Sequence, residues 1–331
     1  MSERGATQPS ALSATVVAAI EDLELSARLV VEGMRTGGNR SPFHGYSTEF
    51  RQHRSYRAGD DLKYLDWKLF ARSDRLYTRQ YRDTTNVPVM IVLDASGSMD
   101  FAGADAESKS VVSRLSPSVN PAYPISKFRY ASIMAAAVAY VASDQGNAVG
   151  MIAMSGSGLS YLPARGGSTH LRTLIATIDR LEPSGQWDSS RVIDRAAQLM
   201  RRRGIVIVIS DLYDDEEQTA RALRRLTRHG HDVSVLQVLS PDERELNASG
   251  QVEFVDAETG ERRLTDAASI APRYGAAMRD FVERCRTESI HSGIDHTLIT
   301  TNYAPERALR DYLQRRAGKR VGGHSHRPMA R

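Results

Sequence analysis

Cysteine is almost absent from this chain, which contains only Cys285. An intrachain disulfide needs two cysteines, so the sequence excludes an internal disulfide framework and favours a reducing, cytosolic setting. Cys285 has no second cysteine and no evident histidine partner in the sequence. We therefore do not expect a catalytic thiol.

Long hydrophobic runs are also missing. The most apolar stretch, residues 131–142, is rich in alanine and falls short of the roughly 18 residues that a membrane span requires. Residues 11–20 are apolar, but the segment before them has only Arg4 as a basic residue, and acidic residues follow between Glu21 and Glu24. This pattern differs from a signal peptide. We expect an N-terminal helix or tail over residues 1–25 and a cytoplasmic protein.

The chain has little excess charge and no internal repeat. It carries 44 Lys and Arg against 40 Asp and Glu, a net charge of +4 over 331 residues. That balance does not call for a polyanionic partner, and the lack of a repeat excludes solenoids and propellers. With 41% hydrophobic and 25% charged residues the composition is that of a soluble globular protein. The length fits two domains, or one large domain with an appendage.

Short apolar runs rich in β-branched residues predict buried strands. They lie at 87–93, 148–154, 204–210, 232–239 and 296–300. Helical patterns alternate with these runs, at 126–143, 169–181, 190–203, 215–229, 271–292 and 305–316. The alternation predicts an α/β domain over residues 86–318, with a doubly wound, mostly parallel sheet. We expect a small hairpin at 251–255 and 262–264, and a disordered basic tail over 319–331.

Residues 26–85 differ in residue pattern from the main domain. They predict a small α+β segment packed on that domain. Between Arg51 and Arg82, basic residues alternate with aromatic ones. Such a pattern is compatible with nucleic-acid binding, in which arginine contacts phosphates and aromatic rings stack on bases. Four aspartates are interspersed with the cations, however, and this favours a solvated, internally paired surface: Asp60, Asp61, Asp66 and Asp74.

The most informative motif follows the first predicted strand of the domain. Asp94, Ser96 and Ser98 lie in the sequence Asp-Ala-Ser-Gly-Ser-Met. In a doubly wound sheet, ligands bind beyond the carboxyl ends of the strands, which is where this loop must lie. One carboxylate and two hydroxyls are oxygen ligands of the kind that Mg²⁺ prefers. We therefore expect a Mg²⁺ or Mn²⁺ site here.

Two later residues extend the predicted metal site. Asp211 directly follows the strand at 204–210, and it meets Asp94 if the two strands are neighbours. Thr169 follows a Gly-Gly-Ser loop and is the candidate for a further hydroxyl ligand. The predicted ligand set is Asp94, Ser96, Ser98, Thr169 and Asp211.

This three-part pattern resembles a von Willebrand factor A domain with a metal-ion-dependent adhesion site. The segments 41–50 (SPFHGYSTEF), 54–61 (RSYRAGDD) and 65–68 (LDWK) resemble the bacterial family catalogued as domain of unknown function 58. The likeness runs from about residue 26 to residue 316. It implies a von Willebrand factor A-like fold, a metal that recruits an acidic side chain from a partner, and a MoxR-type AAA+ ATPase as that partner.

The resulting hypothesis is a protein-binding factor without catalytic residues, active in a chaperone-like or complex-assembly system. A Mg²⁺-dependent phosphoryl hydrolase is the alternative, since an aspartate at a strand end also occurs as a nucleophile. Such phosphatases place a second aspartate two positions later as a general acid. Ser96 stands there instead, and a hydroxyl does not fill that role near neutral pH.

Overall fold

The computed structural model describes residues 22–36, 48–55, 69–70, 72, 75–83, 87–103, 125–246, 250–258 and 260–322. The strands are β1 (Thr48–Ser55), β2 (Tyr77–Asp83), β3 (Val89–Asp94), β4 (Val149–Ser155), β5 (Gly158–Arg165), β6 (Ile205–Ser210), β7 (Asp232–Leu239), β8 (Gln251–Val255), β9 (Arg262–Asp266) and β10 (Asp295–Thr300). The helices are α2 (Leu23–Thr36), η2 (Gly97–Asp100), α5 (Lys127–Asp144), α6 (Ser168–Asp179), α7 (Ser189–Leu199), α8 (Glu216–Arg228), α9 (Pro241–Arg244), α10 (Ala267–His291) and α11 (Pro305–Gly322).

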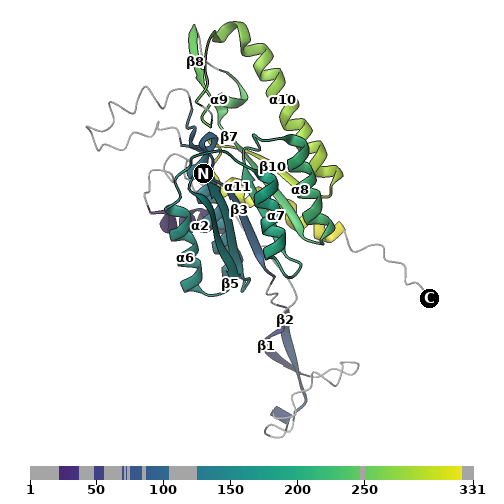
Figure 1. Cartoon of the computed structure of the whole chain (residues 1–331). Helices are drawn as coiled ribbons and strands as arrows, with labels where there is room; N and C mark the ends of the chain where they lie inside the picture. Colours follow the sequence, from purple (N-terminus) through teal and green to yellow (C-terminus); the bar gives the residue numbers. More distant parts are fainter. Residues whose placement is uncertain are drawn as a thin grey trace, which may run out of the picture.

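A six-stranded sheet organises the main domain, in the order β10-β7-β6-β3-β4-β5. All neighbouring pairs are parallel except β4 and β5, which are antiparallel. Helices lie on both faces of this sheet (Figure 1). The predicted fold class, a doubly wound and mostly parallel α/β sheet, is therefore confirmed. The strand order reverses at β3, and doubly wound sheets bind their ligands at such a switch point.

Alternate residues of β3 point to opposite faces of the sheet and so into two separate cores, as the pleat of a strand requires. Val89, Ile91 and Leu93 join the core formed with α2, α5, α6 and α11. Met90 and Val92 join the core formed with α7, α8 and one face of α10. Every residue of β3 and of β6 is buried. Burial on both faces explains why these strands are apolar throughout.

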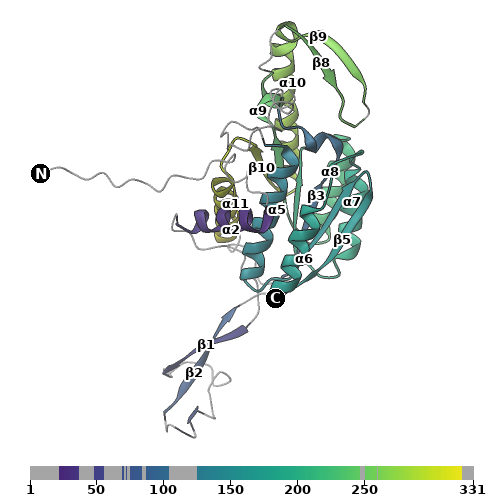
Figure 2. The same cartoon turned by 90° about the vertical axis from the view of Figure 1, so that its left-hand side faces the viewer.

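The N-terminal segment contributes one helix to the domain. The apolar face of α2 is buried in the first core, where it lies against α5 and α11. The antiparallel hairpin β1–β2 projects away from the end of the sheet in both views (Figures 1 and 2). Residues 1–21, 37–47 and most of 56–74 lie outside the described residues, so the predicted division of the chain into domains stays a prediction.

One strand and the end of one helix differ from the sequence-based predictions. No strand was predicted at residues 158–165, where the structure has β5. Helix α11 extends to Gly322 and enters the predicted disordered tail, of which residues 323–331 lie outside the described residues. The predicted small hairpin is present as β8–β9 and projects with the first part of α10 beyond the sheet (Figure 2). In the described ranges, none of the helices combines the length and apolar character that crossing a bilayer demands.

Candidate metal site at the carboxyl edge of the sheet

Asp94 is the last residue of β3 and lies at the centre of the carboxyl edge. Its side chain is fully buried. One carboxylate oxygen accepts a hydrogen bond from the Ser96 backbone N–H at 2.9 Å, and the other accepts one from the Ser210 hydroxyl. The chain then turns into η2, which begins at Gly97. These contacts fix the orientation of the Asp94 carboxylate.

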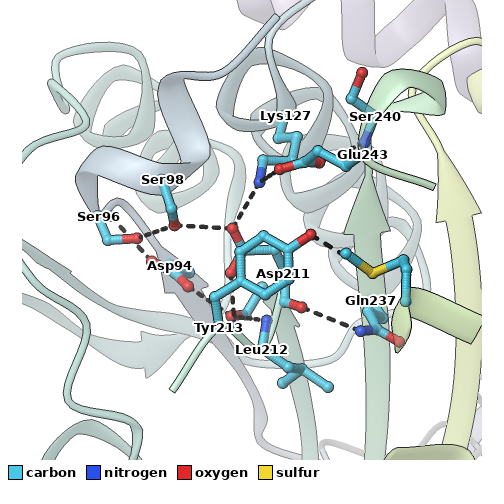
Figure 3. A network of polar contacts seen from close by, with 12 residues as sticks. Asp94, Ser96, Ser98, Lys127, Asp211, Leu212, Tyr213, Gln237, Ser240 and Glu243 are labelled. Carbon is cyan, nitrogen blue, oxygen red and sulfur yellow. Dashed lines mark hydrogen bonds and ion pairs between the residues drawn. The ribbon is translucent and has the colours of Figure 1, made fainter. Parts of the chain in front are cut away.

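Asp211 reaches the same place from β6, which pairs directly with β3. The Ser98 hydroxyl donates to the Asp211 carboxylate at 2.8 Å, and the Ser96 and Ser98 hydroxyl oxygens lie 3.1 Å apart (Figure 3). The structure thus brings together four of the five predicted ligands: Asp94, Ser96, Ser98 and Asp211. They form a continuous chain of oxygen atoms across the two central strands.

The backbone after Asp211 is strained. Leu212 has a φ of 66°, in the left-handed region that residues other than glycine rarely adopt. Hydrogen bonds hold this turn, since the Leu212 N–H donates to the Ser210 hydroxyl and the Tyr213 N–H donates to the Asp211 carboxylate. The Gln237 side-chain amide also donates to the Asp211 carbonyl oxygen at 3.1 Å. Strain of this kind persists where the surroundings over-determine the conformation, and it is common at functional sites.

Burial, followed by the nearby negative charge of Asp211, raises the pKa of Asp94 to about 7. Hydrogen bonds from Ser210 and Ser96 oppose this shift without overcoming it. Two carboxylates that share a buried site repel one another unless a positive charge lies near them. The site therefore favours the approach of a cation.

Lys127 supplies one positive charge and was not predicted as a site residue. Its side chain is fully buried at the start of α5, and its ammonium group contacts Asp211 at 2.7 Å and also Glu243 (Figure 3). The ammonium lies 4.7 Å from the centre of the Tyr213 ring. Burial alone would lower the pKa of Lys127, but the charges of Asp211 and Glu243 raise it above its ordinary value. Lys127 is therefore charged.

The residues present fit a divalent cation in charge and in ligand type. With all groups ionised, three carboxylates (Asp94, Asp211 and Glu243) face one ammonium, which leaves two negative charges. Carboxylate and hydroxyl oxygens are the ligands that Mg²⁺ prefers. The described residues contain no group of three or more His, Cys, Asp or Glu arranged to hold a metal. A metal here would therefore rely on the serine hydroxyls and on a further ligand from elsewhere.

The structure does not bring Thr169 to this site, which corrects the predicted ligand set. Strand β5 runs antiparallel to β4, and its last residue, Arg165, pairs with Val149 at the beginning of β4. Thr169 follows in the first turn of α6, where it is exposed. The neighbouring His170 ring contacts the Val149 carbonyl oxygen at 2.9 Å. Thr169 thus lies at the amino edge of the sheet, opposite Asp94.

The segment between α6 and α7 reaches the site instead. The Ser184 N–H donates to the Ala95 carbonyl oxygen, and the Gly97 N–H donates to the Gly185 carbonyl oxygen, both at 2.9 Å. Gly185 has a φ of 71°, which glycine adopts without strain. The Pro-Ser-Gly sequence at 183–185 predicts a turn, but only the position of β5 shows which edge of the sheet the turn occupies.

Comparison with known proteins gives matches at the levels of family, sequence and structure. The family model described as "Protein of unknown function DUF58" matches residues 52–121 and 115–284. Uncharacterized protein Rv1480 of Mycobacterium tuberculosis is 29% identical over 248 residues, which cover 74% of this chain and 72% of that protein.

Two solved structures are also similar. An aerotolerance-related membrane protein from Bacteroides fragilis has a TM-score of 0.45 and 19% identity, covering 70% of this chain and 99% of that one. The SpRpn10 VWA domain has a TM-score of 0.38 and 12% identity, covering 68% of this chain and 94% of that one. The family model spans more than half of the sequence, and the sheet has a doubly wound order with an antiparallel edge strand. The chain therefore belongs to the DUF58 family.

Proposed function

We propose that this protein is a metal-dependent protein-binding factor whose site takes Mg²⁺ or Mn²⁺ at Asp94, Ser96, Ser98 and Asp211. The observation that carries the proposal is the meeting of these two carboxylates and two hydroxyls at the switch point of the sheet. The raised pKa of Asp94, caused by burial and by Asp211, supports it. Lys127 offsets only part of the negative charge.

The chain's own residues have separate roles in this proposal. Ser96 and Ser98 present neutral oxygens, while Asp94 and Asp211 supply the negative charge that holds the ion. Lys127 and the strained turn at Leu212 keep the Asp211 carboxylate in place. The metal supplies residual positive charge, which attracts an additional carboxylate.

The ligand set favours recognition of an acidic side chain. Two carboxylates and two hydroxyls leave a cation short of its usual six oxygen ligands, so a partner Asp or Glu can complete the shell. We infer a MoxR-type AAA+ ATPase as the partner, on the basis of the family resemblance, in a chaperone-like or complex-assembly system. The proposal assigns no catalytic role, because Ser96 stands where the phosphatase alternative needs a general acid.

A pull-down with the MoxR-type ATPase of the same genome tests this function. The parent chain should retain the ATPase with Mg²⁺ and lose it with a chelator, and Asp94→Ala should lose it in both conditions. Asp144→Ala is the control, because Asp144 is an exposed residue at the far end of α5 that pairs with Arg35. An exposed pair of this kind contributes only about 0 to 1 kcal/mol. Equal retention by all three chains, with or without chelator, would refute metal-dependent recognition.

A further inference from the structure

A groove of about 860 Å³ runs between helices α8 and α10, which lie next to each other on one face of the sheet (Figure 1). Its floor is apolar and consists of Leu212, Leu223 and Ile294, which are 6%, 4% and 2% exposed. These side chains belong to the second core of the domain. The groove therefore reaches the apolar core between two surface helices.

Two buried hydroxyl groups that line the groove already have partners within the protein. The Thr219 hydroxyl contacts the Ser189 hydroxyl at 2.6 Å. The Ser289 hydroxyl donates to the Cys285 carbonyl oxygen at 2.8 Å. A ligand gains little from hydrogen bonds to these two groups, so the interior of the groove favours an apolar surface.

The rim of the groove has an excess of negative charge. Arg284 of α10 pairs with Glu216 of α8 at 2.8 Å. Arg224 of α8 pairs with Glu288 of α10, so two ion pairs connect the helices. Five carboxylates and two guanidinium groups line the groove in all, which leaves three negative charges: Glu216, Glu217, Asp280, Glu283, Glu288, Arg224 and Arg284.

The three remaining carboxylates, of Glu217, Asp280 and Glu283, are exposed at the rim. Arg221 contacts Glu217 and Arg286 contacts Glu283 within their own helices, but exposed pairs of this kind are weak. From residue 280 to residue 288, α10 advances about 12 Å, which is roughly two helical turns. The negative charge is therefore spread along the groove and over both walls, and a single ammonium group cannot reach all of it.

We propose that the groove between α8 and α10 binds an amphipathic helix of a partner protein, with apolar residues on one face and lysine or arginine beside them. Apolar side chains one helical turn apart lie on the floor, and the cations meet the carboxylates of the rim. The inference goes beyond the proposed function, because the groove selects a basic partner surface without a metal. The proposed metal site selects an acidic side chain.

Fluorescence anisotropy of a dye-labelled peptide tests the proposal on the full chain. The probe is a helical peptide of about 15 residues with leucine on one face and lysine on the flanks, and the comparison peptide has glutamate in place of each lysine. The parent chain should bind the lysine peptide and not the glutamate peptide. Ala220→Trp fills the groove from the wall of α8, and Asp280→Asn with Glu283→Gln removes two rim charges. Each change should weaken binding about tenfold.

A matched control removes the same charge from the other face of the domain. Glu32→Gln with Asp144→Asn neutralises two exposed carboxylates on α2 and α5, and this variant should bind the lysine peptide as the parent does. Urea midpoints establish that the variants fold. If Ala220→Trp does not fold, the variant at Asp280 and Glu283 decides, since both of its positions are exposed.

Three results would refute the inference: no binding of the lysine peptide, equal affinity for both peptides, or unchanged affinity in the groove variants. Self-association of the parent that Ala220→Trp abolishes would overturn it by assigning the groove to a second copy of the chain. All titrations contain a chelator, so the outcome does not depend on the proposed metal site. Failure of peptide binding therefore leaves the proposed function standing, and failure of metal binding leaves this inference standing.

Discussion

Lys127 links the carboxylates of Asp211 and Glu243 through its ammonium group. Its buried ammonium pairs with Asp211 and Glu243. Lys127→Met should lower the free energy of unfolding by about 3 to 5 kcal/mol, because it leaves buried carboxylates without a partner. Urea denaturation at pH 7 measures this loss. Arg221→Met is the control, since Arg221 is exposed and pairs with Glu217 one helical turn away, and it should cost less than about 1 kcal/mol.

His296 gives the domain a predictable response to acid. Burial, followed by the positive charge of Arg286, lowers its pKa to about 4. The His296 ring contacts the Gln237 side chain at 3.0 Å. The unfolded chain binds a proton near pH 6.5, so the contribution of His296 to stability is complete above that pH and is lost as the pH falls towards about 4.

His296→Gln should therefore flatten the loss of stability across this interval. The difference amounts to about 2 to 3 kcal/mol, at about 1.4 kcal/mol for each unit of pKa. Urea midpoints of the parent and the variant, measured between pH 7 and pH 4, give the comparison. Parallel curves for the two proteins would show that His296 is not held neutral in the fold.

At the scale of elements, the contact between η2 and the β8–β9 hairpin depends on a glycine. Gly97→Ala would place a Cβ atom 2.6 Å from the Ala257 carbonyl oxygen, so the tip must move away. We expect faster hydrogen exchange in the hairpin and a loss of stability of about 1 to 3 kcal/mol. Gly166→Ala is the control, because a Cβ atom there meets nothing within 4 Å. Unchanged exchange in Gly97→Ala would show that the tip does not rest on this loop.

The strands and helices of the domain could be predicted because their sequence patterns are local. The runs that became β3, β6 and β7 are apolar on both faces, and Asp94 and Asp211 follow two of them directly. Strand β5 was missed because its sequence, GLSYLPAR, has no β-branched residue and contains Pro163, which strands tolerate at an edge. Without β5, Thr169 was assigned to the wrong edge of the sheet.

Lys127 was missed for a different reason. Lys127 meets Asp211 and Glu243 across 84 and 116 residues of sequence, and no local pattern marks it as the partner of either. Long-range placement of this kind follows from the fold and not from a motif.

At the scale of the whole molecule, α2 is an integral part of the domain. Val31 is 1% exposed in the core shared with α5 and α11. Val31→Asp should lower the free energy of unfolding by about 3 kcal/mol or more, because it buries an unpaired carboxylate in place of an apolar side chain. Chemical denaturation measures the change, and Glu32→Ala, on the exposed side of the same helix, should behave as the parent. Equal midpoints for Val31→Asp and the parent would contradict this packing.

Isothermal calorimetry of Mg²⁺ and Mn²⁺ binding tests the central claim most directly. The parent chain should bind one divalent ion, because Asp94, Ser96, Ser98 and Asp211 present their oxygens together at the carboxyl edge. Asp94→Ala should lose this binding, while Thr169→Ala should retain it, since Thr169 lies at the opposite edge of the sheet. Binding of equal affinity by the parent and by Asp94→Ala would contradict the account.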